Sequence, residues 1–254
     1  ERLTRQAVLG DAPLEERRTQ AVQSRRYGDP RSADELGRLD TDAIASVREE
    51  AWPQASTSDE MHELATGIGA VTASDLEREP GWLPLLESLA RDGRATCLAT
   101  GDPDAPLLWV TTERLPQLRA VHPDARESPA VTVPAEYAAE AWARDEGLRE
   151  LVRARLTALG PVTAGAIAAP LGVAESDVIL ALLALQQEGY VLGGRFTPGT
   201  GVDEWCERHL LARIHRYTLR RLRREIEPVE RRDFARFLFD WQHLGPDTRV
   251  EGPD

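Results

Sequence analysis

The sequence predicts a mainly α fold with small β-hairpins. In several segments apolar residues recur every three or four positions, and a proline or glycine ends most of these segments. Two series of three such segments each end in a pair of short strand-like stretches separated by turn residues. Helix, helix, helix and hairpin is the order of a winged helix, so we expect tandem winged-helix domains followed by a long helix.

The first expected domain covers residues 41–121 and comes after a charged N-terminal helical arm over 1–40. Its apolar spacing predicts three helices, with Thr57 or Ser58 as the N-cap of the second. Two apolar stretches then predict a hairpin that turns at 101–104. The expected elements are helices over 43–52, 59–68 and 82–89, and strands over 94–99 and 107–110.

The second expected domain covers residues 146–200 and comes after a Pro- and Ala-rich linker over 122–145, which turns helical near 135–143. Thr163 is the expected N-cap of its second helix. Gly172 supplies the positive φ that the tight turn to the third helix requires. The expected elements are helices over 148–159, 163–171 and 178–185, and strands over 190–192 and 195–197.

The last region, 201–254, is expected to begin with a long basic helix that comes after the hairpin and reaches about Glu225. Pro228 cannot continue that helix, because proline lacks the backbone N–H of the helical ladder. A further helix is expected from Arg231 to about His243, leading to a next domain.

Composition excludes several classes of protein. The 254 residues carry a net charge of −12, and all 31 basic residues are arginine. Without lysine, the chain has neither a P-loop phosphate-binding lysine nor a Schiff-base nucleophile. Residues 41–146 hold 8 arginines against 20 acidic residues, whereas 205–236 hold 10 arginines against 5. The negative net charge argues against a protein that coats nucleic acid with its whole surface, but it allows a local stripe of basic residues.

The two cysteines, Cys97 and Cys206, give no disulfide framework, so we expect a reducing, cytoplasmic setting. No apolar run is long enough to cross a bilayer, and no membrane contact is expected. Because the sequence begins at Glu1, without a methionine or an apolar leader, it reads as an internal piece of a longer protein.

No catalytic or metal-binding residue is predicted. Glycine-rich phosphate loops, the nucleophile elbow and the zinc-protease motif do not occur in the sequence. Neither Asp34-Glu35 nor Asp203-Glu204 comes after the buried strand that would hold a helicase acidic pair against Mg²⁺. Cys206 and His209 are three residues apart, but two ligands do not close a tetrahedral zinc shell.

The strongest positive signal is a stripe of basic residues on one face of the expected long helix. Arginine binds phosphate oxygens bidentately, so the stripe suits a nucleic-acid backbone. The alternative is ion pairing of the same arginines with the acidic middle of the chain or with a neighbouring subunit. The candidate nucleic-acid-binding residues are Arg213, Arg216, Arg220, Arg223 and Arg224, with Arg94 and Arg195 in the two hairpins.

The third helix of each expected domain argues against sequence-specific DNA reading. In a winged helix this element enters the major groove and carries Arg, Asn or Gln on its outer face. Here one third helix begins Glu175-Ser176-Asp177 and contains no arginine, and the other is preceded by Glu77 and Glu79. Acidic residues at these positions would repel phosphates, so both domains are expected to be scaffold or protein-contact units.

The long helix carries a family resemblance. The run Glu204–Leu219, with Glu225–Val229 and the subsequent Asp233–His243, is similar to a segment of the Lhr (large helicase-related) family. The upstream stretches Arg25–Asp29 and Glu35–Asp40 are similar too, so the resemblance spans most of the chain.

The resemblance implies a bacterial superfamily 2 helicase that moves 3′ to 5′ at the expense of ATP and takes part in DNA repair. It implies that the C-terminal region is built from tandem winged helices that support self-association, and that some members carry uracil-DNA glycosylase activity. The motor motifs are absent from this sequence. The chain is therefore expected to need no cofactor itself, whereas its parent would use ATP and Mg²⁺.

The sequence supports three hypotheses of function. In the first, the segment contacts DNA, single-stranded or tailed duplex, through the backbone and packs against the motor domains of its parent chain. In the second, it is a protein–protein module that assembles a homo-oligomer. In the third and weakest, it forms part of a uracil-DNA glycosylase region, where an extruded base requires a stacking pocket.

Overall fold

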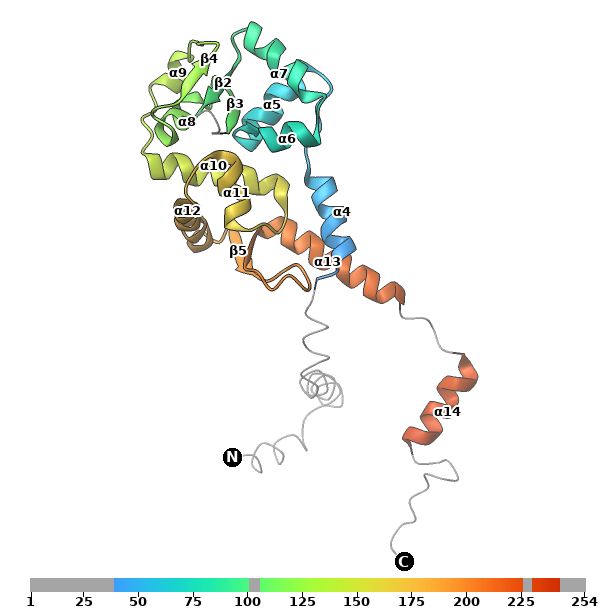
Figure 1. The fold of residues 1–254 in the computed structure, drawn as a ribbon. Coiled ribbons are helices and arrows are strands. Elements are labelled where there is room, and N and C mark those ends of the chain that lie inside the picture. The colour runs from blue at the N-terminus through green and yellow to red at the C-terminus, as the bar shows by residue number, and fades with distance from the viewer. Residues whose placement is uncertain (1–38, 101–105, 226–229, 243–254) are drawn as a thin grey trace, which may run out of the picture. The chain divides into compact units, whose positions relative to one another are not determined.

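The computed structural model describes residues 39–100, 106–225 and 230–242. The chain divides into two compact units, Glu1–His215 (the first unit) and Arg216–Asp254 (the second unit). The described residues are mostly helical with two small antiparallel sheets, which confirms a mainly α fold with small hairpins (Figure 1). Within these ranges no helix is long and apolar enough to cross a membrane.

Several expectations lie outside the described residues and stay predictions. They concern the arm before residue 39, the acidic pair Asp34-Glu35, the turn at 101–104, the helix break at Pro228 and the helix end at His243.

The first unit begins with α4 (Thr41–Ala51), which the Asp40 side chain caps by accepting from the Ala43 amide at 2.8 Å. A first repeat comes next, with Thr57 as the N-cap of its first helix through a capping box with Glu60. The elements of this repeat are α5 (Ser58–Ile68), β1 (Val71–Thr72), α6 (Ala73–Arg78), α7 (Trp82–Arg91), β2 (Ala95–Ala99) and β3 (Leu107–Thr111).

The strands of the first repeat form a sheet of order β1-β3-β2-β4, all antiparallel. In it β3 pairs Thr72 with Leu108 on one side and Cys97 with Trp109 on the other. After the repeat come α8 (Leu115–Val121), β4 (Arg126–Ser128), which adds to the free side of β2, and α9 (Ala135–Ala138). The expected linker over 122–145 therefore contains a strand as well as a short helix.

A second repeat has the same order of elements. Thr163 caps its second helix as predicted, and Gly172 ends that helix with φ +64° in the left-handed region. Between its first two helices Val162 makes a single antiparallel bridge to Trp205, at the place where the first repeat has β1. The elements are α10 (Arg144–Leu159), α11 (Ala164–Leu171), α12 (Glu175–Gln187), β5 (Val191–Gly194) and β6 (Glu204–Glu207).

The helices expected over 43–52, 59–68 and 82–89 are present as α4, α5 and α7, and the structure adds the short α6 between β1 and α7. One expectation about the strands is wrong. In the second repeat the partner of β5 is β6, not residues 195–197. The buried Glu204 carboxylate explains this, because it accepts hydrogen bonds from the amides of Phe196 and Thr197 and so holds them in the loop. The long helix, α13 (Arg208–Glu225), consequently begins only after β6.

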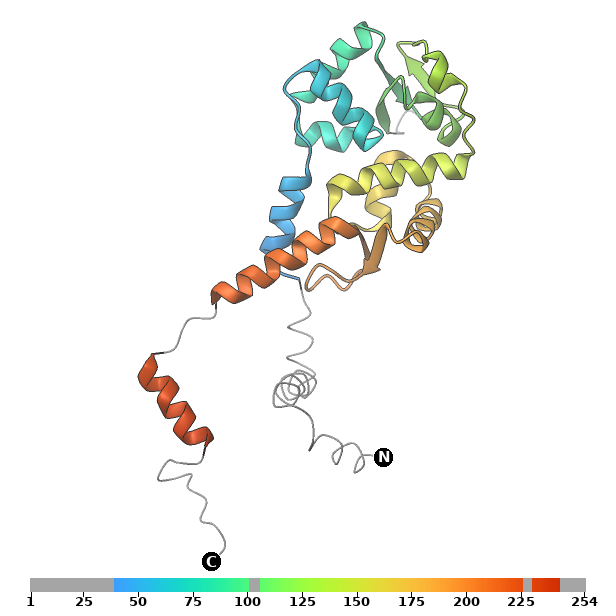
Figure 2. The ribbon, with the colours of Figure 1, turned by 180° about the vertical axis from the view of Figure 1, so that it is seen from behind.

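The two repeats share one apolar core through α10. Leu151 and Leu156 are fully buried and pack in one cluster with Leu98 and Leu108 of the first repeat and Leu182 of the second. Figure 2 shows α10 running between α5 and the α11–α12 pair. The two repeats therefore pack against each other through α10.

The second unit holds the rest of α13 and α14 (Arg231–Trp241). On α14 the rings of Phe237 and Trp241 stack with centroids 5.9 Å apart, and both remain more than half exposed. Phe234 and Phe239 are exposed as well, so none of the four aromatic rings of this helix is buried.

Candidate nucleic-acid interface

The first turns of α13 belong to the first unit and are fixed by their own residues. The Glu207 carboxylate accepts from the Leu210 amide at 2.8 Å, which caps the helix after β6. Leu210 and Ile214 are buried and hold this end of the helix in the first unit. Arg213, on the basic face, donates to the Glu50 carboxylate of α4 at 2.5 Å. The first arginine of the stripe is therefore already paired with an acidic residue of the same chain.

The remaining arginines of the stripe lie in the second unit. Arg216, Arg220, Arg223 and Arg224 are exposed, and no ion pair of theirs is found in the described part of the chain. The Arg220 guanidinium lies 5.9 Å from the centre of the Tyr217 ring. At 1.5 Å per residue, Arg216 and Arg223 are about 10 Å apart along the helix. Four guanidinium groups thus face solvent over two to three turns of one helix.

The two hairpin arginines have acidic partners. Arg94 contacts Asp59 at 2.6 Å, and Arg195 contacts Asp203 at 3.1 Å. Both pairs are well exposed, and an exposed ion pair contributes only about 0–1 kcal/mol. A phosphate could therefore replace either carboxylate, but neither arginine is as available as those of the second unit.

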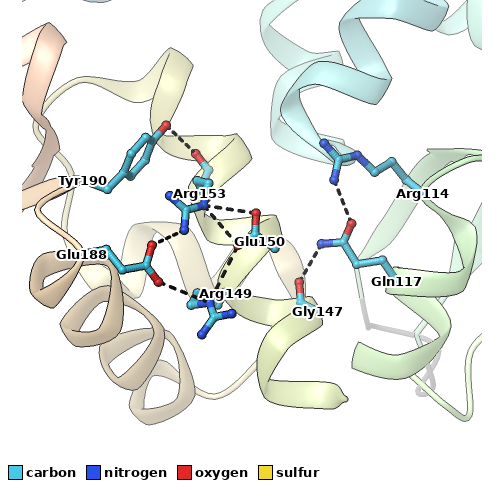
Figure 3. Close-up of polar contacts among 8 residues, drawn as sticks. All are labelled: Arg114, Gln117, Gly147, Arg149, Glu150, Arg153, Glu188 and Tyr190. Atoms are coloured by element: carbon cyan, nitrogen blue, oxygen red, sulfur yellow. Dashed lines mark hydrogen bonds and ion pairs between the residues drawn. The ribbon is translucent and has the colours of Figure 1, made fainter. Parts of the chain in front are cut away.

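Other arginines of the first unit are used inside its structure, as Figure 3 shows for α10. Arg153 contacts Glu150 at 3.1 Å and also Glu188, and its guanidinium lies 4.7 Å from the centre of the Tyr190 ring. Arg149 lies 3.8 Å from both carboxylates. These contacts join α10 to the end of α12 and pair both arginines with carboxylates of the same unit.

A second group in Figure 3 connects α8 with α10. The buried Gln117 side chain donates to the Gly147 carbonyl at 2.7 Å and accepts from Arg114 at 3.0 Å. Arg114 also donates to the Thr66 carbonyl of α5 at 3.0 Å. This arginine therefore connects α5 with α8 through hydrogen bonds within the first unit.

The outer faces of the third helices carry little positive charge. On α12 the exposed apolar residues are Ile179, Leu180 and Leu183, and Leu180 is 66% exposed. Val178, Leu182 and Leu185 of the same helix are buried. The sequence contains a signal for the exposure of the other three, because one helix face cannot bury all the aliphatic residues between 178 and 185.

The cysteine and histidine residues do not form a reactive or metal-binding group in the described ranges. Cys206 is fully buried, and this burial raises the pKa of its thiol to about 12. Burial also raises the pKa of the Cys97 thiol. His209 and His215 are exposed on α13. No group of three or more His, Cys, Asp or Glu side chains that could hold a metal ion is found among the residues described.

A buried histidine lies at the end of α8. The Nε2 atom of His122 is buried without a hydrogen-bond partner. Desolvation, followed by the positive charge of Arg144, lowers the pKa of this histidine, while a hydrogen bond with the Leu171 backbone opposes the shift. The fold therefore favours the neutral form of His122.

The site and the fold define a helical, double-repeat chain with an exposed arginine-bearing helix, and one comparison adds a similarity to a known protein. The chain is 28% identical over 265 residues to a Mycolicibacterium smegmatis protein named "Lhr helicase/ probable uracil glycosylase". The match covers 96% of this chain but only 16% of that protein, so the chain spans about a sixth of its relative. No family model matches the chain. The similarity supports a relationship to the Lhr family.

Proposed function

We propose that the chain is a non-motor segment of an Lhr-type, ATP-dependent DNA helicase and contacts nucleic acid without sequence preference. The single observation that carries this proposal is the set of four exposed arginines on the second-unit part of α13. They lack ion pairs among the described residues, whereas Arg213 of α13 and Arg153 of α10 are paired. In this proposal ATP and Mg²⁺ belong to the motor domains of the parent.

The repeats suit this role as winged helices. Each has the order helix, strand or bridge, helix, helix, strand, strand, and the element after the first helix pairs with the last strand. Because α7 and α12 carry few basic groups outward, the proposed contact is made by the long helix and not by the third helices. We therefore expect binding to phosphates rather than to base edges.

The salt dependence of binding tests the proposal. A labelled single strand of mixed sequence is titrated with the chain at about 50 mM and about 200 mM salt. Four phosphate contacts predict that affinity falls on the order of 50-fold between these conditions. The variant Arg216→Glu/Arg220→Glu/Arg223→Glu should lose at least tenfold in affinity at the lower salt, with an unchanged mass in sedimentation. An affinity that changes neither with salt nor with the triple substitution would refute the proposal.

A second candidate function is supported by the outer face of α12. Ile179, Leu180 and Leu183 form an exposed aliphatic patch on a helix whose own sequence holds no arginine, which suits a protein rather than a phosphate backbone. In this alternative the segment assembles an oligomer. The residues whose substitution would change the mass in solution then differ from those whose substitution would change the affinity for DNA. Substituting Leu180→Glu/Leu183→Glu would dissociate an oligomer in sedimentation if this face carries the assembly. An unchanged mass would exclude it.

A further inference from the structure

The two repeats are joined by a buried ion pair, between Arg155 of α10 and Asp75 of α6. The Arg155 guanidinium donates to both carboxylate oxygens, at 2.7 Å to Oδ2 and 3.0 Å to Oδ1. It donates a third hydrogen bond to the Ala70 carbonyl at 3.2 Å. The two side chains are only 7% and 5% exposed. Arginine and aspartate are rarely this buried unless they are paired, and this pair spans the two repeats.

Asp75 is fixed from its own side as well. Its carboxylate accepts from the Thr72 amide at 2.8 Å, and its amide donates to the Thr72 hydroxyl at 3.3 Å, which together form the capping box of α6. The aspartate therefore cannot follow Arg155 if α10 slides or turns against the first repeat. Any such movement would break directional bonds and leave a charge buried without its partner.

The apolar contacts around the pair are close but do not define a direction. Gly69, with φ +85°, lies so near α10 that a Cβ on it would be 2.8 Å from the Leu151 Cδ1 atom. Apolar packing of this kind favours contact in proportion to buried area, and several arrangements of two helices bury similar areas. The ion pair, in contrast, consists of directional hydrogen bonds, which depend on the geometry of both partners.

We propose that Arg155 and Asp75 set the angle and register of the two repeats, and that this role exceeds their contribution to stability. Replacing a buried ion pair by apolar residues of similar size is often neutral or stabilising, because two charges no longer have to be desolvated. The pair would then act as a positioning device that makes the double repeat a rigid body. The proposal depends on contacts within the first unit and is independent of nucleic-acid binding.

The test separates position from stability. Two spin labels are introduced at exposed sites of the two repeats, Glu87→Cys on α7 and Gln187→Cys on α12, in a Cys97→Ser background. Cys206 does not compete, because it is buried and its thiol pKa is raised to about 12. Electron–electron distance measurements then compare the parent with Asp75→Leu/Arg155→Met. We expect a single narrow distance in the parent and a broadened or displaced distribution in the double variant.

Thermal unfolding of the same proteins completes the test. Arg155→Met alone leaves Asp75 buried and unpaired and should lower Tm on the order of 10 °C. The double variant should recover most of that loss, and Arg155→Lys, which keeps the charge without the planar fork, should broaden the distance less than the double variant. The partly exposed pair of α8 and β4, removed as Arg119→Met/Glu127→Gln, is the matched control and should change neither measurement. A double variant with the parent's narrow distance would overturn the proposal, and so would one that fails to recover Tm.

Discussion

The arginines of the first unit and those of the second unit have different environments. In the first unit, Arg155 is buried against Asp75, and Arg153 lies between Glu150 and Glu188. In the second unit, Arg216 and Arg223 are exposed and have no ion pair among the residues described. The difference arises from the position of the acidic residues, since the acidic middle of the sequence folds within the first unit. The number of arginines therefore predicts a binding surface only when arginines that pair with acidic residues of the same chain are left out of the count.

The largest expected effect contrasts packing in the two units. Leu151→Ala removes a fully buried side chain from the core that the repeats share, and should lower the free energy of unfolding by about 3–4 kcal/mol. Phe237→Ala, on α14, removes a ring that is already 57% exposed and should change it by about 0.5 kcal/mol or less. Urea unfolding followed by circular dichroism measures both. Equal losses would mean that the second unit is packed as firmly as the first.

The next effect compares exposed with paired arginines in binding. Neutralising the second-unit arginines as Arg216→Gln/Arg220→Gln/Arg223→Gln should reduce the slope of log affinity against log salt by about 2. The control, Arg119→Gln/Arg144→Gln/Arg153→Gln, removes the same charge from arginines that contact Glu127, Asp177 and Glu188. It should leave the slope within about 0.5 of the parent. Similar slopes for the two triple variants would contradict the comparison.

A smaller effect is expected from His122 as pH falls. Its folded-state pKa is lowered by desolvation and by Arg144, so the unfolded chain binds a proton more readily than the folded chain. The neutral histidine therefore contributes its full stability above the unfolded pKa of about 6.5, and that contribution is lost as pH falls from there towards the lower folded pKa. Unfolding in urea at several pH values between about 7.5 and about 5 should show a steeper loss in the parent than in His122→Gln. Parallel curves would exclude His122 as the source.

The smallest effects are expected at the hairpin arginines. Arg94→Ala and Arg195→Ala each remove an exposed ion pair, with Asp59 and Asp203 respectively, and should lower the free energy of unfolding by less than about 1 kcal/mol. Each should also lower single-strand affinity less than Arg216→Ala does, because its carboxylate partner competes with phosphate. Anisotropy titrations of the three single variants, side by side, rank these contacts. A hairpin variant that binds more weakly than Arg216→Ala would move the interface to the hairpins.

Local signals in the sequence predicted much of the fold. Thr57 and Thr163 are the helix caps that their spacing indicated, and Gly172 adopts the expected positive φ. The second strand of the last hairpin was misplaced, because the Glu204 carboxylate determines where the loop ends, through side-chain bonds to amides seven and eight residues away. The spacing of apolar residues does not reveal such bonds.

The candidate site could likewise be predicted from the sequence only in part. The spacing of the stripe arginines on one helix face could be read from the sequence, because it depends only on the helical repeat. That Arg213 pairs with Glu50 could not, because the two residues are 163 positions apart. The pairing of Arg155 with Asp75, 80 positions apart, was equally out of reach. Which arginines remain exposed is a property of the tertiary structure.

The position of α10 in a core common to both repeats limits how the chain can be shortened. A cut in the stretch between α8 and α10 would deprive the first half of Leu151 and Leu156, and would leave the second half with an open apolar side. Neither half is then expected to be an autonomous fragment for expression or for grafting onto another protein. Truncations that keep residues 39–215 intact, and vary only the second unit, preserve this shared core.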